Sequence, residues 1–227
     1  MNLAKGAQST ADLILDVAEA QFAEHGYKAV SLRSILRECG ANAAAAHYHF
    51  GSKEQILAAI FERRCAGMNS ARLDLLDAAE KSAAPDLIER ILDAFLRPAL
   101  VWKDDDKGTR RFMRLRAVVA YEQEALARDL IARYFNDTSQ RFIEALHRRL
   151  PHLGLPELYL RFQFLLGAHY YTVLNPHRIQ DLSKGLCDPA DTEVTLRTMI
   201  ALFAAGLRAP NVLPLPSGAV PSMETTL

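Results

Sequence analysis

The stretch from Ser31 to Lys53 constrains the fold more than any other part of the chain, because it contains the signals of short helices around a tight turn. Ser31 can cap the first helix by accepting a backbone hydrogen bond, and apolar residues then recur at helical spacing. Gly40 ends this helix, since glycine tolerates the left-handed conformation. Asn42 can cap a second helix, and Ser52 a third. Two short helices around such a turn are typical of a helix-turn-helix motif.

The composition indicates a soluble protein of the cytoplasm. Half of the 227 residues are apolar, so the chain can bury a large core. Lysine plus arginine and aspartate plus glutamate balance at 27 each, so the net charge of the whole chain indicates no polyanionic partner. Three cysteines in unrelated settings (Cys39, Cys65 and Cys187) favour a reducing compartment. The longest apolar run, 199–207, is far below the roughly 18 residues that span a bilayer.

Apolar residues recur at helical spacing along most of the chain, and no stretch alternates at period two. Besides the motif, this spacing predicts helices over 10–25, 53–80, 85–102, 109–121, 124–150, 157–174 and 191–207. Pro85 is expected in the first turn of its helix, and Pro98 is expected to kink the same helix. The fold class is therefore all-α, with about nine or ten helices.

Three regions follow from this pattern. Residues 7–65 form a three-helix domain that contains the motif at 31–50, and residues 66–208 form a larger helical domain. The boundary lies inside a long helix, because no flexible linker separates the two. Residues 209–227 are expected to be a disordered tail, since four prolines interrupt this segment.

The motif closely resembles the N-terminal domain of TetR-family transcriptional regulators. The resemblance rests on the run Tyr48-His49-Phe50-Gly51-Ser52-Lys53-Glu54, which follows a glycine turn and an earlier helix ending in Phe-Ala-Glu-His-Gly-Tyr. The C-terminal half more weakly resembles the branch that contains the fatty-acid-responsive regulator of Pseudomonas, in segments 111–115, 153–156, 164–168 and 203–209. The resemblance implies a dimeric repressor or activator, not an enzyme, whose C-terminal helices bind a small effector.

The second helix of the motif is expected to enter the major groove of DNA. Asn42 can pair bidentately with adenine, although a plain N-cap is an equal interpretation. Ala43 and Ala44 offer contacts to thymine methyl groups, and the role of His47 stays open. His47 and His49 do not indicate a metal site, because no carboxylate or cysteine ligand follows them. The phosphate candidates are Ser31, Arg33, Tyr48, His49 and Lys53; the resemblance implies such contacts for Tyr48 and Lys53.

The charge of the first 55 residues does not form a basic patch. This segment contains five basic and six acidic residues. Any positive face must therefore come from the arrangement of the side chains, with symmetry and DNA shape supplying part of the specificity.

The C-terminal helices are expected to provide the dimer interface and the effector site. Helices 157–174 and 191–207 mix small and large apolar residues, and the family implies that they pair with a second copy; ordinary packing within the chain is the alternative. Arg116 or His169 can meet a carboxylate. Each cavity candidate can also be plain core, and Arg116 can pair with Glu122 or Glu124 on the surface. The candidates are Trp102, Phe112, Met113, Arg116, Phe135, Phe142, His169 and Tyr170.

The sequence thus favours a ligand-responsive regulator, with repression as the commoner mode, that binds a palindromic operator on double-stranded DNA as a homodimer. A small hydrophobic effector, with a fatty acid or acyl-CoA among the candidates, would release it. No cofactor or metal is implied. The alternatives are a small all-α enzyme or a helical module without DNA binding. Against the enzyme, the chain contains no nucleophile elbow, glycine-rich phosphate loop or His/Cys metal cluster.

Overall fold

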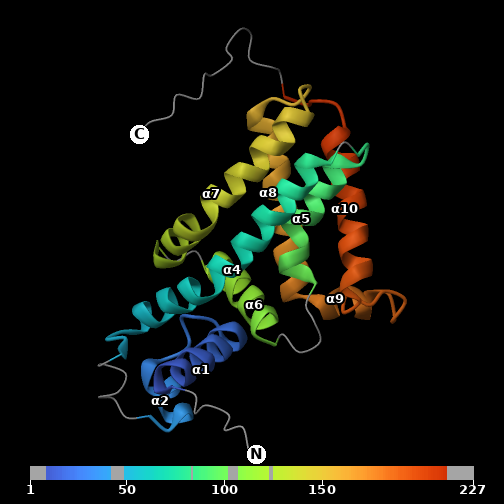
Figure 1. Ribbon diagram of the computed structural model, residues 1–227. Coiled ribbons are helices and arrows are strands. Elements are labelled where there is room, and N and C mark those ends of the chain that lie inside the picture. Colours follow the sequence, from blue (N-terminus) through green and yellow to red (C-terminus); the bar gives the residue numbers. More distant parts are fainter. Residues whose placement is uncertain (1–8, 42–48, 83, 102–106, 123–124, 214–227) are drawn as a thin grey trace, which may run out of the picture.

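The computed structural model describes residues 9–41, 49–82, 84–101, 107–122 and 125–213, and the regular elements within these ranges are all α-helices. This confirms the predicted all-α class. Nine helices lie in the described part of the chain and are labelled in Figure 1: α1 (Thr10–His25), α2 (Leu32–Cys39), α4 (Lys53–Lys81), α5 (Leu87–Leu100), α6 (Lys107–Glu122), α7 (Ala125–Arg149), α8 (Leu155–Leu174), α9 (Pro176–Leu182) and α10 (Thr192–Arg208).

The first helices begin and end at the residues that the sequence predicts. The Ser31 side chain accepts a hydrogen bond from the backbone N–H of Ser34, and Ser52 accepts one from Gln55. Gly40 follows α2 with a φ of 63°, in the left-handed region that favours glycine. Gly26 ends α1 with a φ of 85°, and a Cβ atom there would lie 2.5 Å from Glu122 Oε1. The N-terminal helices therefore follow from local capping chemistry.

Prolines set several boundaries differently from the prediction. Pro85 lies in the turn before α5, whose N-cap is Asp86, and not in the first helical turn. The helix continues through Pro98 to Leu100. Pro156, one residue before the predicted start of its helix at 157, belongs to the first turn of α8. Backbone N–H groups in the first turn of a helix have no acceptor within the helix. Proline, which has no N–H, is therefore tolerated there.

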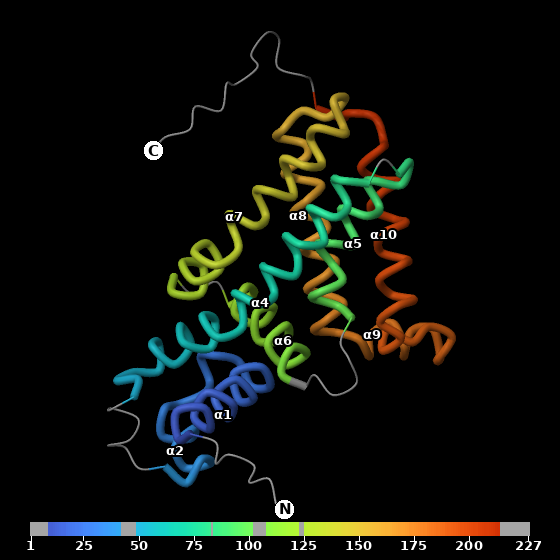
Figure 2. The backbone as a smooth tube through the Cα atoms, viewed as in Figure 1, coloured from blue at the N-terminus to red at the C-terminus, as the bar shows by residue number. Residues whose placement is uncertain are grey.

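The long helix α4 joins two apolar clusters. Its first half shares one cluster with residues of α1, α2, α5, α6 and α7, and its second half shares the other with residues of α5, α7, α8 and α10. Figure 2 shows α4 running from the N-terminal helices into the larger helical region. The first cluster extends past the predicted boundary at 65 to Met68 and includes Phe112 of α6. The N-terminal helices therefore pack directly on α6.

The segment after α10 is held against α8. Glu157 Oε2 accepts hydrogen bonds from the backbone N–H groups of Val212 and Leu213, both at 2.8 Å. Arg161 Nη1 donates one to the Ala209 carbonyl oxygen at 2.9 Å. The prediction of a disordered tail from residue 209 is therefore wrong for 209–213, because a buried carboxylate and an arginine fix the backbone. Residues 214–227 lie outside the described ranges.

None of the described helices combines the length and the hydropathy that a membrane crossing requires.

Candidate nucleic-acid interface and internal cavity

The N-terminal end of α2 presents a serine and an arginine to solvent. Ser31 and Ser34 form a reciprocal capping box, in which each side chain accepts a hydrogen bond from the other residue's backbone N–H at 3.1 and 3.2 Å. The Ser31 hydroxyl thus acts as an acceptor here, and its own hydrogen remains able to donate. Arg33 is exposed on the first turn of the helix. Exposed donors at a helix N-terminus suit an anion such as phosphate.

Lys53 begins α4 and holds the connection between α1 and α2. Its ammonium donates hydrogen bonds to the carbonyl oxygens of Tyr27 at 2.9 Å and Val30 at 3.0 Å. The ammonium also lies 4.2 Å from the centroid of the Tyr27 ring. Of the three ammonium hydrogens, two are thus directed at backbone oxygens, which leaves one for a further acceptor. A phosphate contact by Lys53 stays a prediction.

The remaining residues predicted to touch DNA divide into two sets. His49 is exposed beside Phe50, with 6.1 Å between the ring centroids. Five predicted contacts lie outside the described residues: Asn42, Ala43, Ala44, His47 and Tyr48. The predicted base contacts therefore stay predictions.

A buried carboxylate joins α1 to α4. The Glu19 side chain is fully buried, and it pairs with Arg63 at 2.7 Å and with Arg64 at 3.0 Å. Arg63 also reaches Asp16 at 2.8 Å. The sequence analysis missed this cluster, although Glu19 interrupts the apolar stripe of its helix. Two arginines on one carboxylate fix the angle at which the N-terminal helices meet α4.

Helix α6 lies beside α1, as Figure 1 shows. Arg114 Nε donates a hydrogen bond to the Ala23 carbonyl oxygen at 2.9 Å. The backbone N–H of Lys28 donates to Glu122 Oε1 at 3.4 Å. These contacts connect the last turn of α1 and the residues after it with the middle and the end of α6.

A cavity of about 610 Å³ lies between α7 and α8 and extends inward to Arg116 of α6. This volume lies within the range of ligand-binding pockets. Its inner wall is mostly apolar and aromatic: Ile131, Phe135, Ile143, Phe162, Leu166 and Tyr170. Exposed Asn136 and Asp137 lie at its margin. Ser139, Gln140 and Gln163 also line the cavity, which thus combines apolar walls with polar side chains and one basic group, Arg116.

Three of the eight predicted effector residues line this cavity: Arg116, Phe135 and Tyr170. Phe112 packs against Phe61 in one cluster, and Phe142 packs against Phe95 in the other, with ring centroids 5.4 and 5.1 Å apart. Met113 and His169 are also buried, and Trp102 lies outside the described residues. The alternative of Arg116 as a surface residue is wrong, since only 2% of it is exposed.

Arg72 of α4 is a second buried arginine, which the sequence analysis missed. It is 1% exposed, its Nε donates to the Phe95 carbonyl oxygen at 2.9 Å, and its guanidinium lies 4.3 Å from the Phe95 ring centroid. A signal was present, because Met68 and Leu76 are placed four residues before and after it on the buried face of α4.

Burial and positive charge shift the pKa values of the groups around Arg116. Burial, and then the charge of Arg116, lower the pKa of Arg72 to about 9. The same two causes, with Arg72 as a third, hold the pKa of His169 well below its usual value, so the imidazole is neutral near pH 7. Burial raises the pKa of Cys65 to about 12 against the opposing effect of the two arginines. The interior is thus electropositive.

Helices α8 and α10 expose large apolar side chains. Phe164 is 62% exposed and Tyr171 50% on α8, while Leu202 is 66% exposed on α10. Apart from the backbone of the same helix, no described atom lies within 4 Å of the position that a Cβ atom would occupy at Gly167 or Gly206, so each is open to close approach. These are the helices that the sequence predicts to pair with a second copy.

Known proteins resemble the chain over both regions. A family model described as bacterial regulatory proteins of the tetR family matches residues 14–60, and one described as a tetracyclin repressor-like C-terminal domain matches residues 93–206. The HTH-type transcriptional repressor ComR of Escherichia coli K12 is 32% identical over 87 residues, 37% of this chain and 41% of that protein. The HTH-type transcriptional repressor Rv3405c of Mycobacterium tuberculosis is 34% identical over 88 residues, 39% of this chain and 43% of that protein. The chain therefore matches less than half the length of these curated relatives.

A solved structure shows the same fold over most of the chain. The TetR-family transcriptional regulator PfmR of Thermus thermophilus superposes with a TM-score of 0.61 at 20% identity, over 87% of this chain and 96% of that one. The C-terminal family model alone covers half of the sequence, and the N-terminal model covers the helix-turn-helix region. The chain belongs to the TetR family, whose members are DNA-binding transcriptional regulators and not enzymes.

Proposed function

We propose that the chain acts in the cytoplasm as a ligand-responsive repressor, which binds a palindromic operator as a homodimer and leaves it when a small apolar effector enters the cavity. Two recognition helices about 34 Å apart, or a multiple of that distance, would then meet two half-sites on one face of the DNA. Fatty acids and acyl-CoA are candidate effectors.

The described N-terminal residues support contacts between this domain and the phosphate groups of DNA. Ser31 and Arg33 lie exposed at the start of α2, and His49 is exposed before α4. Lys53 holds the loop between α1 and α2 in place through hydrogen bonds to its backbone carbonyl oxygens. Residues that contact phosphates set orientation and affinity, while base contacts set sequence preference.

The exposed apolar faces of α8 and α10 support a dimer. Phe164 and Leu202 would each remove a large apolar surface from water when they pack against a second copy. The open sides of Gly167 and Gly206 would let the helices approach closely. We assign the interface to 157–174 and 191–207, where a four-helix arrangement would set the distance between the two DNA-binding domains.

The position of α6 carries the proposal of ligand response. Arg116 of this helix lines the cavity, and Arg114 on the same helix donates a hydrogen bond to the Ala23 carbonyl oxygen of α1. A ligand that displaces α6 would therefore also displace α1, which packs on this helix. Effector binding would shift the population towards dimers whose recognition helices no longer match the operator.

A gel-shift titration with the DNA directly upstream of the protein's own gene tests this function. The full-length protein should retard that DNA and not a fragment with scrambled half-sites, and affinity should fall steeply with salt. Arg33→Ala should reduce the slope of log K against log salt by about one, because one phosphate contact is lost. Lys81→Ala, an exposed change at the far end of α4, serves as the matched control.

Two results would contradict the proposal. If the protein binds specific and scrambled DNA equally at every salt concentration, it does not recognise an operator. If Arg33→Ala and Lys81→Ala behave identically, Arg33 does not contact phosphate.

A further inference from the structure

Arg72 and Arg116 are two buried arginines without a carboxylate partner. They are 1% and 2% exposed, and no carboxylate of the described residues lies within ion-pair distance of either guanidinium. Among the described residues, Arg72 Nη2 and both Nε and Nη1 of Arg116 have no hydrogen-bond partner. Arginine is rarely fully buried unless it is paired, because removing its charge from water costs free energy.

Aromatic rings compensate only part of this cost. The Arg116 guanidinium lies 3.9 Å from the Phe135 ring centroid and 5.2 Å from that of Tyr170. Such contacts satisfy the flat face of a guanidinium through the charge distribution of the ring. The N–H groups point outward within the guanidinium plane, where hydrogen-bond acceptors are needed. At Nε and Nη1 of Arg116 and at Nη2 of Arg72, the described residues therefore do not supply the acceptors that an oxyanion would provide.

His169 adds a third unpaired polar group to this cluster. It is 1% exposed, and neither ring nitrogen has a hydrogen-bond partner. Its ring lies 5.5 Å from that of Tyr170, and both arginine charges act on it. A neutral imidazole has one N–H donor, so it can contribute a hydrogen bond to a bound anion.

A ligand in the cavity between α7 and α8 can reach this cluster, because Arg116 lines that cavity together with apolar side chains. We propose that Arg116 binds the oxyanion head group of an organic acid whose apolar body occupies this cavity. This inference rests on the proposed effector response and specifies its ligand class. A planar guanidinium fork matches the oxygens of a carboxylate or a phosphate.

Calorimetric titration with four eight-carbon probes tests the inference: octanoate, octyl phosphate, octan-1-ol and octylamine. The full-length protein should bind at least one anionic probe about tenfold or more tightly than octan-1-ol, because only an oxyanion pairs with the guanidiniums. Octylamine should bind most weakly. The ratio between octanoate and octyl phosphate identifies the head group.

Arg116→Met keeps the approximate side-chain length and removes the charge. The variant should bind octan-1-ol as the wild type does and lose the preference for the anion, while Gln140→Ala in the cavity wall should keep it. Arg116→Lys should keep part of the preference, since the charge remains without the fork. Replacement of an unpaired buried charge by methionine should also raise the melting temperature of the ligand-free protein.

Equal binding of octanoate and octan-1-ol, or no binding of either anionic probe, would overturn the inference. So would an unchanged preference in Arg116→Met. Operator binding in the gel shift is read separately. Its loss with an intact anion preference would contradict the regulator proposal and leave the anion site standing, and the reverse pattern would contradict only the anion site.

Discussion

The Arg114 side chain of α6 donates a hydrogen bond to the Ala23 carbonyl oxygen of α1 across 2.9 Å, two residues from the arginine that lines the internal cavity. One helix thus contacts the N-terminal domain and the candidate effector site. A rigid element shared by two sites can couple them when it has two arrangements that each site biases differently.

Arg114→Met should weaken the packing of α1 against α6 and so destabilise the protein. The change removes a hydrogen bond from a charged donor, worth about 1–3 kcal/mol, while the aliphatic packing of the side chain is kept. Urea unfolding should therefore report a lower free energy of unfolding than for the wild type. Arg178→Ala, an exposed change on α9, is the control. Equal losses in both variants would remove Arg114 from its proposed role.

Glu19→Gln should destabilise the junction of α1 and α4. Glu19 is fully buried between Arg63 and Arg64, and neutralising it removes the anion that Arg64 pairs with and leaves Arg63 with Asp16 alone. Breaking a buried ion pair on one side typically costs about 3–5 kcal/mol, and the partial exposure of the two arginines places this case at the lower end. Glu24→Gln on the exposed side of α1 should change the unfolding midpoint little. A wild-type midpoint for Glu19→Gln would contradict the prediction.

The stability of the protein should fall on acidification partly through His169. Its folded pKa is held below the unfolded value by burial and by the two arginines. Below about pH 6.5 the unfolded chain therefore binds a proton that the folded chain does not, and stability falls by up to about 1.4 kcal/mol per pH unit. His169→Phe should reduce this fall between pH 7.5 and 5.5 in urea titrations.

His177→Phe is the matched control, because that histidine is exposed on α9. It should leave the difference between the two pH values as in the wild type. If His169→Phe keeps the full wild-type difference, His169 is not the group that resists protonation.

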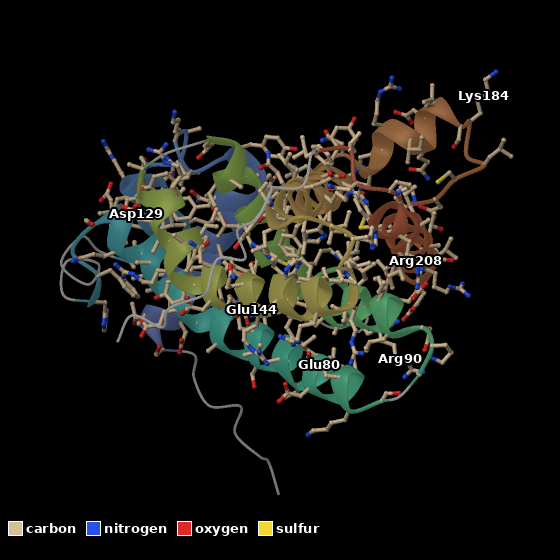
Figure 3. The ribbon with its side chains drawn as sticks, turned by 90° about the horizontal axis from the view of Figure 1, so that it is seen from above. Glu80, Arg90, Asp129, Glu144, Lys184 and Arg208 are labelled. Carbon is tan, nitrogen blue, oxygen red and sulfur yellow. The ribbon has the colours of Figure 1, made fainter. Side chains whose placement is uncertain are left out.

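The three cysteines should react with a thiol reagent at very different rates. Cys187 is exposed in the segment between α9 and α10, which Figure 3 shows projecting from the helices around Lys184. Burial raises the pKa of Cys39 and raises that of Cys65 to about 12. At pH 8 only about one Cys65 thiol in ten thousand is ionised, and the thiolate is the reactive form.

Ellman's reagent at pH 8 should therefore show one fast thiol, which Cys187→Ser removes. Cys65 should react only after unfolding. A fast phase that survives in Cys187→Ser would assign the accessible thiol elsewhere.

Phe164→Glu should convert a dimer into monomers. The side chain is 62% exposed on α8, and a carboxylate there would lose hydration in an apolar interface. Sedimentation velocity should report half the wild-type mass, and operator affinity should fall with it. Leu186→Glu changes a residue that is 94% exposed outside these helices and should remain dimeric. A dimeric Phe164→Glu protein would place the interface on another surface.

Tertiary contacts at the end of the bundle where α10 ends cannot be predicted from sequence periodicity. Arg208, labelled in Figure 3, ends α10 and pairs with Glu89 of α5 at 2.6 Å, although 119 positions separate the two residues. Glu157 likewise holds the backbone of 212–213. Such pairs depend on which helices become neighbours, and helical spacing along one segment carries no information about that choice.

The sequence by itself determined the helices and the family. Ser31, Gly40 and Ser52 act within a few residues of themselves, so their capping roles could be predicted before any packing was known. Only the tertiary structure decided the chemistry of the interior. A long arginine side chain on an apolar helix face commonly extends its charge to water. Packing around α4 and α6 instead encloses Arg72 and Arg116, because neighbouring helices cover both side chains, and the cavity reaches Arg116.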